Sequence, residues 1–441
     1  MVRVVGLIWI LLLPIAATAS GEWPEFRGPT SDGHSTAVGL PLKWSEKQNV
    51  RWKTAIHGRG WSSPAVWGNQ IWMTTATEDG RQLFAVCVDR ATGKVLLDRK
   101  VFENSHPEPL GNDVNSYATP SPVIESGRVY MTFGSPGTIC LDTKTFNTVW
   151  TRRDLPCRHY RGASSSPILF QDKLILTFDG ADYQYVAALF TKTGLTAWRM
   201  DRSADWNDMD ASGKPFMEGD QRKAHSTPTL TLVNGQPRMI SIGAKAGYCY
   251  DPRNGKEIWK VNFKGFSPSF RPVIGFGMAF IPTGYGGSDL WAVRLDGQGD
   301  VTNSNVAWKY SKMIPQKPSP ILVDDLIYLL NDSGVVSCLE AKTGAPVWQE
   351  RVGGRFSASP LYAEGRIYCF SEEGRVIVLK AGRKLEILAE NELESGFMAS
   401  AAVAGKALIL RTRTHIYRIE ASGSRSARAG NRSDLVVRSR Q

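Results

Sequence analysis

The chain repeats short apolar runs separated by turns that are rich in Asp, Asn, Ser and Gly. Within Pro318–Gln349 three such runs cover residues 321–323, 326–330 and 335–339, and a fourth follows around Trp348. Short runs of β-branched, aliphatic and aromatic residues bounded by turn residues are typical of antiparallel strands. This stretch therefore predicts a four-stranded meander in which each strand pairs with the next.

The same pattern recurs eight times along the chain. Each unit opens with a small residue followed by proline, or with a variant of that pair, at intervals of 40 to 61 residues. Proline fits the edge strand nearest the axis because its missing N–H is not needed there. A four-stranded repeat of this length predicts the blades of a β-propeller. The opening pairs are Ser63-Pro64, Ser121-Pro122, Ser166-Pro167, Thr227-Pro228, Arg271-Pro272, Ser319-Pro320, Ser359-Pro360 and Ser400-Ala401.

The eighth unit contains only three predicted strands, and a separate strand at Asn49–Ile56 precedes the first unit. Pairing these two segments would remove the free edges that promote aggregation. We therefore predict an all-β fold, an eight-bladed β-propeller of four-stranded antiparallel blades closed by the N-terminal strand.

An eleven-residue motif joins the third and fourth strands of most units, as in CLEAKTGAPVW at 338–348. Its acidic residue accepts hydrogen bonds from the turn, and its glycine adopts a left-handed conformation. Phe146 replaces that glycine in the second unit, where we expect Asn147 to adopt the left-handed conformation instead. A tryptophan closes the motif in five units and predicts a wedge between blades. These residues are Trp150, Trp198, Trp259, Trp308 and Trp348.

This motif and its period resemble the PQQ-like, or quinoprotein, propeller repeat from about Trp23 to Glu420. The segments at 23–29, 57–64 and 159–167 are similar to exported PQQ-like propellers of planctomycete-type bacteria. The propeller subunits of the outer-membrane barrel assembly machinery share the repeat, and their resemblance implies binding of partner chains without a cofactor. The quinoprotein alcohol dehydrogenases also share it, and their resemblance implies pyrroloquinoline quinone (PQQ), a bound Ca2+ and a catalytic aspartate.

The two ends of the chain differ from the repeats. Residues 1–19 have a basic, an apolar and a small-residue segment in turn, which predicts a secretory signal cleaved near Ala19. Its apolar run is too short to span a membrane comfortably. We therefore expect an exported protein of the periplasm or cell envelope that is not integral to a membrane. Residues 20–48 predict an irregular arm across one face, 49–420 the propeller, and 421–441 a disordered basic tail.

Charge and cysteine content narrow the alternatives. The formal net charge is +11, but the body has no basic stripe, so we expect no nucleic-acid partner. Four of the six cysteines stand two residues before the acidic turn residue, which places them in separate sheets beyond the roughly 7 Å limit for a disulfide. We expect these four to be buried packing residues, whereas Cys157 and Cys369 stay open. The four are Cys87, Cys140, Cys249 and Cys338.

The loops that enter the innermost strands of a propeller meet at one mouth of its channel, and here they are rich in His, Arg and aromatic residues. Such side chains would suit an anionic or hydroxyl-rich ligand. Two insertions, Glu103–Asp113 near the mouth and the acidic stretch Asp201–Asp220, lengthen these units, and we expect the second to be solvated. The candidate ligand contacts are His57, Arg59, Trp61, Asn115, Tyr117, His159, Arg161, His225 and Arg271.

The loops at the mouth of the channel offer little support for the hypothesis that the protein is a dehydrogenase. They offer Asp113 as their one carboxylate, whereas Ca2+ requires several oxygen ligands. The sequence also lacks adjacent cysteines and a haem attachment motif. We therefore predict a monomeric binding or protein-interaction scaffold with no catalytic or metal-binding residues and no cofactor, whose ligand is an envelope protein or a polysaccharide. A dehydrogenase using PQQ with Ca2+ and a propeller that binds cell-wall polysaccharide remain the alternatives.

Overall fold

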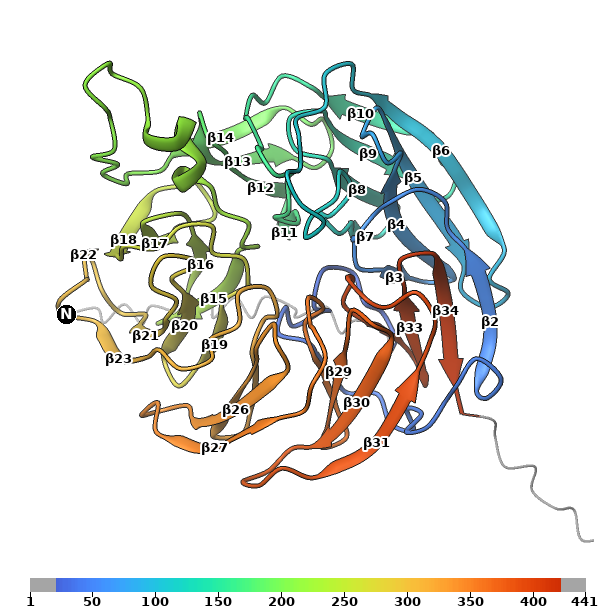
Figure 1. Ribbon diagram of the computed structural model, residues 1–441. Helices are drawn as coiled ribbons and strands as arrows, with labels where there is room; N and C mark the ends of the chain where they lie inside the picture. Colours follow the sequence, from blue (N-terminus) through green and yellow to red (C-terminus); the bar gives the residue numbers. More distant parts are fainter. Residues whose placement is uncertain (1–20, 422–441) are drawn as a thin grey trace, which may run out of the picture.

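The computed structural model describes residues 21–421, which form an almost entirely β-structured ring. Eight sheets surround a central axis like the blades of a propeller (Figure 1). The predicted eight-bladed propeller of four-stranded antiparallel blades is therefore confirmed. The segment predicted to be a secretory signal and all but the first residue of the predicted basic tail lie outside the described residues.

Within each blade the chain runs from the innermost strand to the outermost. Blade one consists of β3 (Ala65–Trp67), β4 (Gln70–Ala76), β5 (Gln82–Asp89) and β6 (Val95–Glu103), and blade two of β7 (Val123–Glu125), β8 (Arg128–Thr132), β9 (Thr138–Asp142) and β10 (Thr148–Arg152). Blade three consists of β11 (Ile168–Phe170), β12 (Lys173–Asp179), β13 (Gln184–Phe190) and β14 (Thr196–Asp201). Blade four consists of β15 (Thr229–Val233), β16 (Gln236–Ile242), β17 (Ala246–Tyr250) and β18 (Glu257–Asn262). Blade five consists of β19 (Val273–Gly275), β20 (Met278–Pro282), β21 (Leu290–Arg294) and β23 (Val306–Tyr310). Blade six consists of β24 (Ile321–Val323), β25 (Leu326–Leu330), β26 (Val335–Glu340) and β27 (Pro346–Arg351). Blade seven consists of β28 (Leu361–Ala363), β29 (Arg366–Phe370), β30 (Arg375–Lys380) and β31 (Ile387–Glu392).

The eighth blade combines the two ends of the propeller. Its inner strands are β32 (Ala402–Ala404), β33 (Ala407–Arg411) and β34 (His415–Glu420), and its outer strand is β2 (Val50–Ala55). β2 pairs antiparallel with β34, with Ala55 opposite His415. The first long strand of the chain thus lies in the same sheet as its last three. Two short strands add parallel pairs, β1 (His34–Ser35) on β28 and β22 (Gly299–Asp300) on β18.

The hydrophobic pattern explains the position of each strand within a blade. All five residues of β25, LIYLL, are buried, because neighbouring blades cover both faces of this central strand. The outer strand β2 instead alternates between half-buried and exposed positions, since one of its faces meets solvent. Continuous apolar runs therefore mark the middle of a blade, and alternating runs mark its rim.

Each closing tryptophan contacts the turn of the next blade. The indole N–H of Trp308 donates to the carbonyl of Ala341 at 3.1 Å, and its ring lies against Gly344. The predicted wedge between blades is therefore confirmed, and each indole is also tied by a hydrogen bond to a backbone carbonyl. The equivalent pairs are Trp150 with Thr191, Trp198 with Pro252, Trp259 with Leu295, Trp348 with Gly382 and, from blade eight to blade one, Trp52 with Arg90.

The expectation for the second unit is wrong. Phe146 itself adopts the left-handed conformation, with φ 61°, and Asn147 does not. Blade one closes its motif with Leu97, which leaves room above the turn that a tryptophan fills in other blades. The Phe146 ring occupies that room and lies 5.7 Å from the ring of Trp72. Burial of this ring compensates for the strain of a left-handed phenylalanine.

All six cysteines are unpaired and buried. The packing role predicted for the four equivalent cysteines is confirmed, and Cys157 and Cys369 are also free thiols. Each of the four repeated thiols lies in the third strand of its blade, facing the apolar core. Small buried thiols of this kind pack as apolar side chains.

A ring of hydrogen bonds, which we call the hydroxyl belt, joins the innermost strands around the axis. The small residue that opens each blade accepts, through its hydroxyl, the backbone N–H of the equivalent residue in the preceding blade. Seven such bonds, 2.8 to 3.0 Å long, are present in the described residues. The pairs, with the residue that donates its N–H given first, are Ser63 and Ser121, Ser121 and Ser166, Ser166 and Thr227, Arg271 and Ser319, Ser319 and Ser359, Ser359 and Ser400, and Ser400 and Ser63.

Residues 21–48, which we call the arm, cross one end of the axis (Figure 1, blue). Trp23 pairs with Val66 of β3, so the arm begins beneath blade one. The Arg27 guanidinium then donates to the carbonyls of Ser319 and Pro320 in blade six. The arm therefore spans the channel from blade one to blade six.

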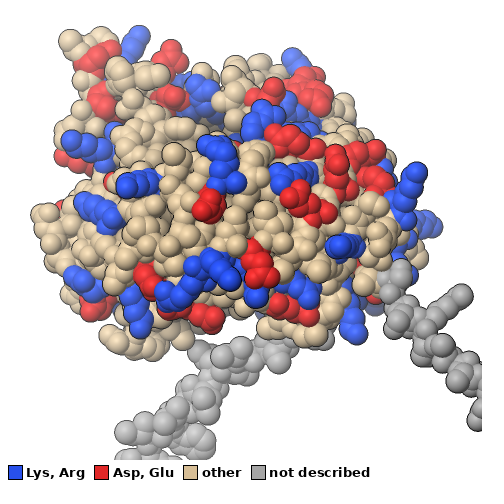
Figure 2. All heavy atoms as spheres, turned by 60° about the horizontal axis from the view of Figure 1, so that its bottom comes forward, with Lys and Arg blue, Asp and Glu red and all other residues tan. Residues whose placement is uncertain are grey.

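The surface of the ring carries both signs of charge. Figure 2 shows lysines and arginines interspersed with acidic residues over one face of the molecule, without a basic stripe. In residues 21–421 no helix is both long enough and apolar enough to cross a membrane.

We predict that Gly344→Ala destabilises the protein by about 2–4 kcal/mol, as measured by chemical denaturation. A Cβ at this position would lie 2.6 Å from the Trp308 ring, and φ is +73°, so steric overlap adds to backbone strain. Gly277→Ala is the matched control, because φ there is +71° but the added Cβ meets nothing within 4 Å. Equal losses for the two variants would show that the tryptophan contact does not require glycine.

We also predict that Ser359→Ala lowers the free energy of unfolding by about 1–3 kcal/mol, because the buried Ser319 N–H loses its acceptor. Ser333→Ala is the control, since that hydroxyl bonds only within its own exposed turn. The denaturation midpoints of the two variants, compared with that of the parent protein, measure the two losses of stability. A loss at Ser359 no larger than at Ser333 would mean that the belt does not stabilise the ring.

Candidate functional site

A cavity of about 400 Å3, which we call the mouth cavity, opens where the loops into the innermost strands meet. Every blade contributes at least one residue to its walls, from Trp61 of blade one to Met398 of blade eight. Six hydroxyls of the belt line it as well. These belong to Ser63, Ser121, Ser166, Thr227, Ser359 and Ser400. The cavity therefore lies on the propeller axis, and its wall is set by the same residues that join the blades.

The arm closes the lower end of this cavity. Phe26 lines it, and Arg27, the next residue of the arm, and Arg271 of blade five are 2% and 1% exposed. Arg271 pairs with Glu25 at 2.9 Å and donates to the carbonyl of Phe26. Since these side chains fill the channel beneath Phe26, the mouth cavity is blind.

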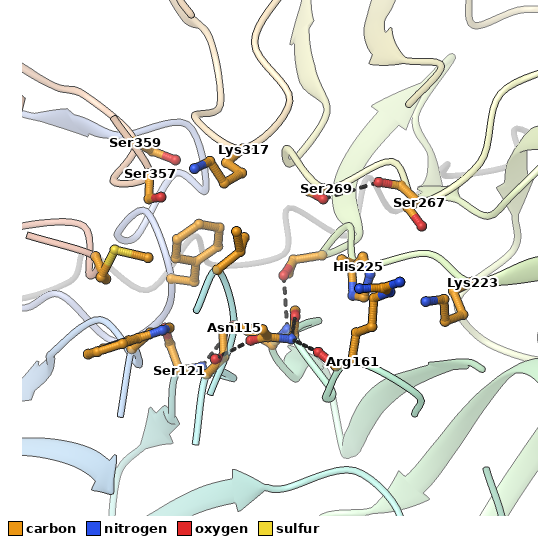
Figure 3. Close-up of a pocket in the computed structure, with 18 of the residues that line it drawn as sticks. Asn115, Ser121, Arg161, Lys223, His225, Ser267, Ser269, Lys317, Ser357 and Ser359 are labelled. Atoms are coloured by element: carbon orange, nitrogen blue, oxygen red, sulfur yellow. Dashed lines mark hydrogen bonds between the residues drawn. The ribbon is translucent and has the colours of Figure 1, made fainter. Parts of the chain in front are cut away.

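Three cations and one carboxylate line the mouth cavity in the part of the chain that is described. Arg161 and Lys223 both pair with Asp220, with 3.5 Å between Arg161 Nε and the carboxylate. Lys317 approaches two carboxylates behind the wall, Asp332 at 3.4 Å and Glu372 at 3.1 Å. Figure 3 shows Arg161 and Lys223 on one side of the cavity and Lys317 on another. The lining itself therefore carries an excess of positive charge.

His225 supplies a neutral imidazole to the same wall as Arg161 and Lys223 (Figure 3). Burial, the Lys223 ammonium and nearby His159 lower the pKa of His225 to about 3. Within residues 21–421 its ring makes no hydrogen bond, and only its backbone N–H is engaged, with the carbonyl of Pro268. One ring nitrogen is thus available to donate and the other to accept.

Asn115 positions the loop that carries Arg161. Its amide group donates to the carbonyls of Arg161 at 2.7 Å and Gly162 at 3.0 Å, and its oxygen accepts from Ser116 N–H. Arg161 has φ 76°, a left-handed conformation that is strained for arginine. Because its carboxamide is already used in these bonds, Asn115 orients Arg161 rather than offering its own hydrogen bonds to a ligand.

Four of the nine predicted contacts line the mouth cavity, namely Trp61, Asn115, Arg161 and His225. The other five lie elsewhere. His57 pairs with Asp98 on the outer strand β6, Arg59 lies over the Trp61 ring, and Tyr117 donates to the carbonyl of Glu108. His159 sits beneath the mouth, where burial lowers its pKa to about 4, and Arg271 is below the floor.

Sequence reasoning missed several residues of the wall. Lys223 and Lys317 lie in loops at the mouth, and the hydroxyls of the belt lie in the opening pairs of the blades, but the repeat pattern alone does not mark them as cavity residues. Asp220 lies at the end of the stretch expected to be solvated. Most of that stretch is exposed between residues 203 and 218, but the 3-10 helix η1 (Phe216–Arg222) returns Asp220 to the mouth, where it is buried. The expectation of a solvated excursion is therefore wrong for Asp220.

The residues of the mouth cavity do not fit a calcium-bound quinone. Ca2+ takes six to eight oxygen ligands, including carboxylates. The lining offers one carboxylate, Asp220, which is already paired with two cations. No group of three His, Cys, Asp or Glu residues within 21–421 is arranged to hold a metal ion. The lining therefore lacks the oxygen ligands that a calcium-bound quinone requires.

Comparison with known proteins places the chain among PQQ-like propellers. The family model described as outer membrane protein assembly factor BamB matches residues 45–247 and 248–425. BamB from Moraxella catarrhalis is 11% identical, with a TM-score of 0.58 over 84% of this chain and 99% of that one. No curated protein sequence matches the chain.

Two further solved structures share the fold. The quinohemoprotein alcohol dehydrogenase from Comamonas testosteroni is 12% identical, with a TM-score of 0.64 over 92% of this chain and 82% of that one. The computationally designed Ika8 protein is 11% identical, with a TM-score of 0.56 over 86% of this chain and all of that one. Because an assembly factor, a dehydrogenase and a designed protein resemble the chain to similar degrees, these likenesses establish the fold alone.

We predict that stability falls as the pH decreases from about 6.5 toward 4. His159 and His225 have pKa values of about 4 and 3 in the folded protein, so the unfolded chain binds more protons over this range. Each histidine contributes a slope of at most about 1.4 kcal/mol per pH unit.

The H159N/H225N double variant should therefore show a flatter dependence of unfolding free energy on pH, measured by denaturant titration. The exposed His106→Asn variant keeps both buried imidazoles and serves as the control. A double variant with the parent slope would contradict the assignment.

Proposed function

The chain belongs to the PQQ-like propeller family described as outer membrane protein assembly factor BamB, and on this basis we propose that it is a binding module of the cell envelope that holds a polypeptide partner at the mouth of its channel. Export by the signal predicted at residues 1–19 would bring it to that compartment.

The blind mouth cavity is the observation that carries this proposal. Its wall presents serine and threonine hydroxyls, the cations Arg161 and Lys317, and the neutral ring of His225, all held by rigid blades. Fixed polar groups around a concave surface give a site orientation and specificity for a polar ligand. A cavity closed from below accepts a group that enters and leaves by the same opening, which suits binding.

The nature of the partner is supported by the family. The matching model is described as a factor of outer membrane protein assembly, a task that involves other polypeptides. A propeller also offers a large rigid surface around its mouth, as an interaction scaffold requires. Two guanidinium groups, those of Arg59 and Arg413, lie over the Trp61 ring at 5.2 and 5.9 Å. They leave less of that ring for stacking on a sugar, so a polypeptide is favoured over a polysaccharide.

The dehydrogenase alternative is less favoured by the residues of the mouth cavity. One carboxylate that is already paired with Arg161 and Lys223 is a poor donor set for the Ca2+ that a quinone would need. Binding of a partner requires no such group.

We predict that a photo-crosslinking amino acid at position 114 captures a polypeptide in the native envelope. Val114 lines the mouth cavity and is 47% exposed, so an apolar photo-reactive group fits there. Leu232, which is 70% exposed on β15, is the control position. Adducts would be separated by mass and identified by mass spectrometry.

The expected result is a discrete polypeptide adduct at position 114 that is absent at position 232 and weakened by Arg161→Glu. Capture of polysaccharide at position 114, or the same adducts at both positions, would contradict the proposal. Dye reduction by the purified protein with Ca2+ and added PQQ would instead support the dehydrogenase.

A further inference from the structure

A second cavity of about 380 Å3 adjoins the mouth cavity on the side of blades three and four. The two cavities share two lining residues, Arg161 and Asp220, which form an ion pair. They are therefore neighbouring parts of one cleft. The second cavity is lined by Arg158, Tyr160, Arg161, Met217, Glu218 and Asp220.

The second cavity has an apolar rim. Met217 lines this cavity and is 56% exposed, and Met209 and Phe216 of the same acidic segment are 61% and 54% exposed. Neighbouring exposed apolar side chains of this kind mark interaction sites. Methionine suits such a site because its flexible, polarizable side chain adapts to different partners.

Strained backbone holds Met217 in this position. Met217 and Glu218 adopt φ values of 49° and 54°, followed by Gly219 at 84°. A Cβ on Gly219 would lie 2.1 Å from the carbonyl oxygen of Ala181, so the turn is pressed against the β12–β13 connection. Strain of this kind persists where the surrounding structure fixes a functional conformation.

The two cavities differ in charge. The mouth cavity carries three cations against Asp220 in the described residues, whereas Arg158 and Arg161 in the second cavity face Glu218 and Asp220. A ligand anion is therefore attracted to the mouth cavity, and an apolar group to the rim beside Met217. The closed floor at Phe26 adds a steric condition, because a chain cannot thread through the cavity and must either end inside it or turn back.

We infer that the partner binds by the carboxyl terminus of its polypeptide chain, with the terminal carboxylate in the mouth cavity beside Arg161, Lys223 and Lys317. An apolar side chain a few residues before the terminus lies in the second cavity on Met217 and Tyr160. Capture of a chain end by cations and hydrogen-bond donors is a known mode of peptide recognition. The inference rests on the proposed function, since it names the part of the polypeptide that is held.

The test uses the full-length protein and a pooled library of random octapeptides with free carboxyl termini. Peptides retained by the protein are identified by mass spectrometry, and the best is labelled for fluorescence anisotropy. The same peptide with an amidated terminus is the matched probe. We expect the free acid to bind at least about tenfold more tightly, as expected for hydrogen bonds to a charged group.

Two variants test which cavity binds the terminal carboxylate and which binds the apolar side chain. Arg161→Gln should weaken binding of the free-acid peptide about tenfold and leave binding of the amidated peptide unchanged. Lys192→Gln, at an exposed turn, should change the affinity for neither peptide. Met217→Ser should weaken binding of the peptide about fivefold. A peptide whose apolar residue is replaced by serine should bind the parent protein and the Met217→Ser variant equally well. Leu232→Ser is the matched control for a lost exposed apolar side chain.

Equal affinity of the free acid and the amide would overturn the inference, as would a library from which no peptide is retained. Binding of acetylglycine as tight as that of the octapeptide would also overturn it, because a small carboxylate needs no second cavity. If a polypeptide adduct still forms at position 114 in any of these cases, the proposed function stands and the chain-end mode alone fails. If the adduct is absent as well, both fail.

Discussion

The inner edge of each blade imposes the constraint on which this propeller depends. The innermost strands face the channel, where a backbone N–H without a partner would be buried at considerable cost. A hydroxyl at the start of each blade meets this need, as when Ser359 accepts from Ser319. The residue must be small enough to sit on the axis and must carry an acceptor. This requirement explains why serine or threonine precedes proline in most units, and it places a ring of hydroxyls in the wall of the mouth cavity.

The belt is interrupted at Arg271, which has no acceptor to offer to the preceding blade. Blades four and five are joined instead by the Ser226 hydroxyl, which donates to the carbonyl of Phe270, and by the Thr229 hydroxyl, which donates to that of Pro272. The Arg271 guanidinium is then available for the arm, and it binds Glu25 and the carbonyl of Phe26. The arm is therefore anchored where the belt is open. One departure from the repeat thus accounts for the closed floor of the cavity.

The repeat made the scaffold predictable, and the loops limited what could be predicted of the site. Strand position follows from local alternation, and the wedge of Trp308 on Gly344 follows from two residue types at fixed spacing. No such rule governs the mouth. His57 and His225 occupy loops of similar composition, yet His57 turns outward to Asp98 whereas His225 faces the cavity. Asp220 could not be placed from sequence because its position depends on η1 and the close approach of Gly219 to Ala181.

The charges of the mouth cavity also bear on selectivity. Arg161 and Lys223 share Asp220, and Lys317 is balanced by Asp332 and Glu372 behind the wall. An incoming anion must therefore compete with carboxylates that are already in place, which weakens the hold on any small anion that makes no other contact. A ligand that also reaches the apolar rim gains a second, independent contribution that the internal carboxylates cannot replace. The ion pairs in the wall thus favour an extended ligand over a single charged group.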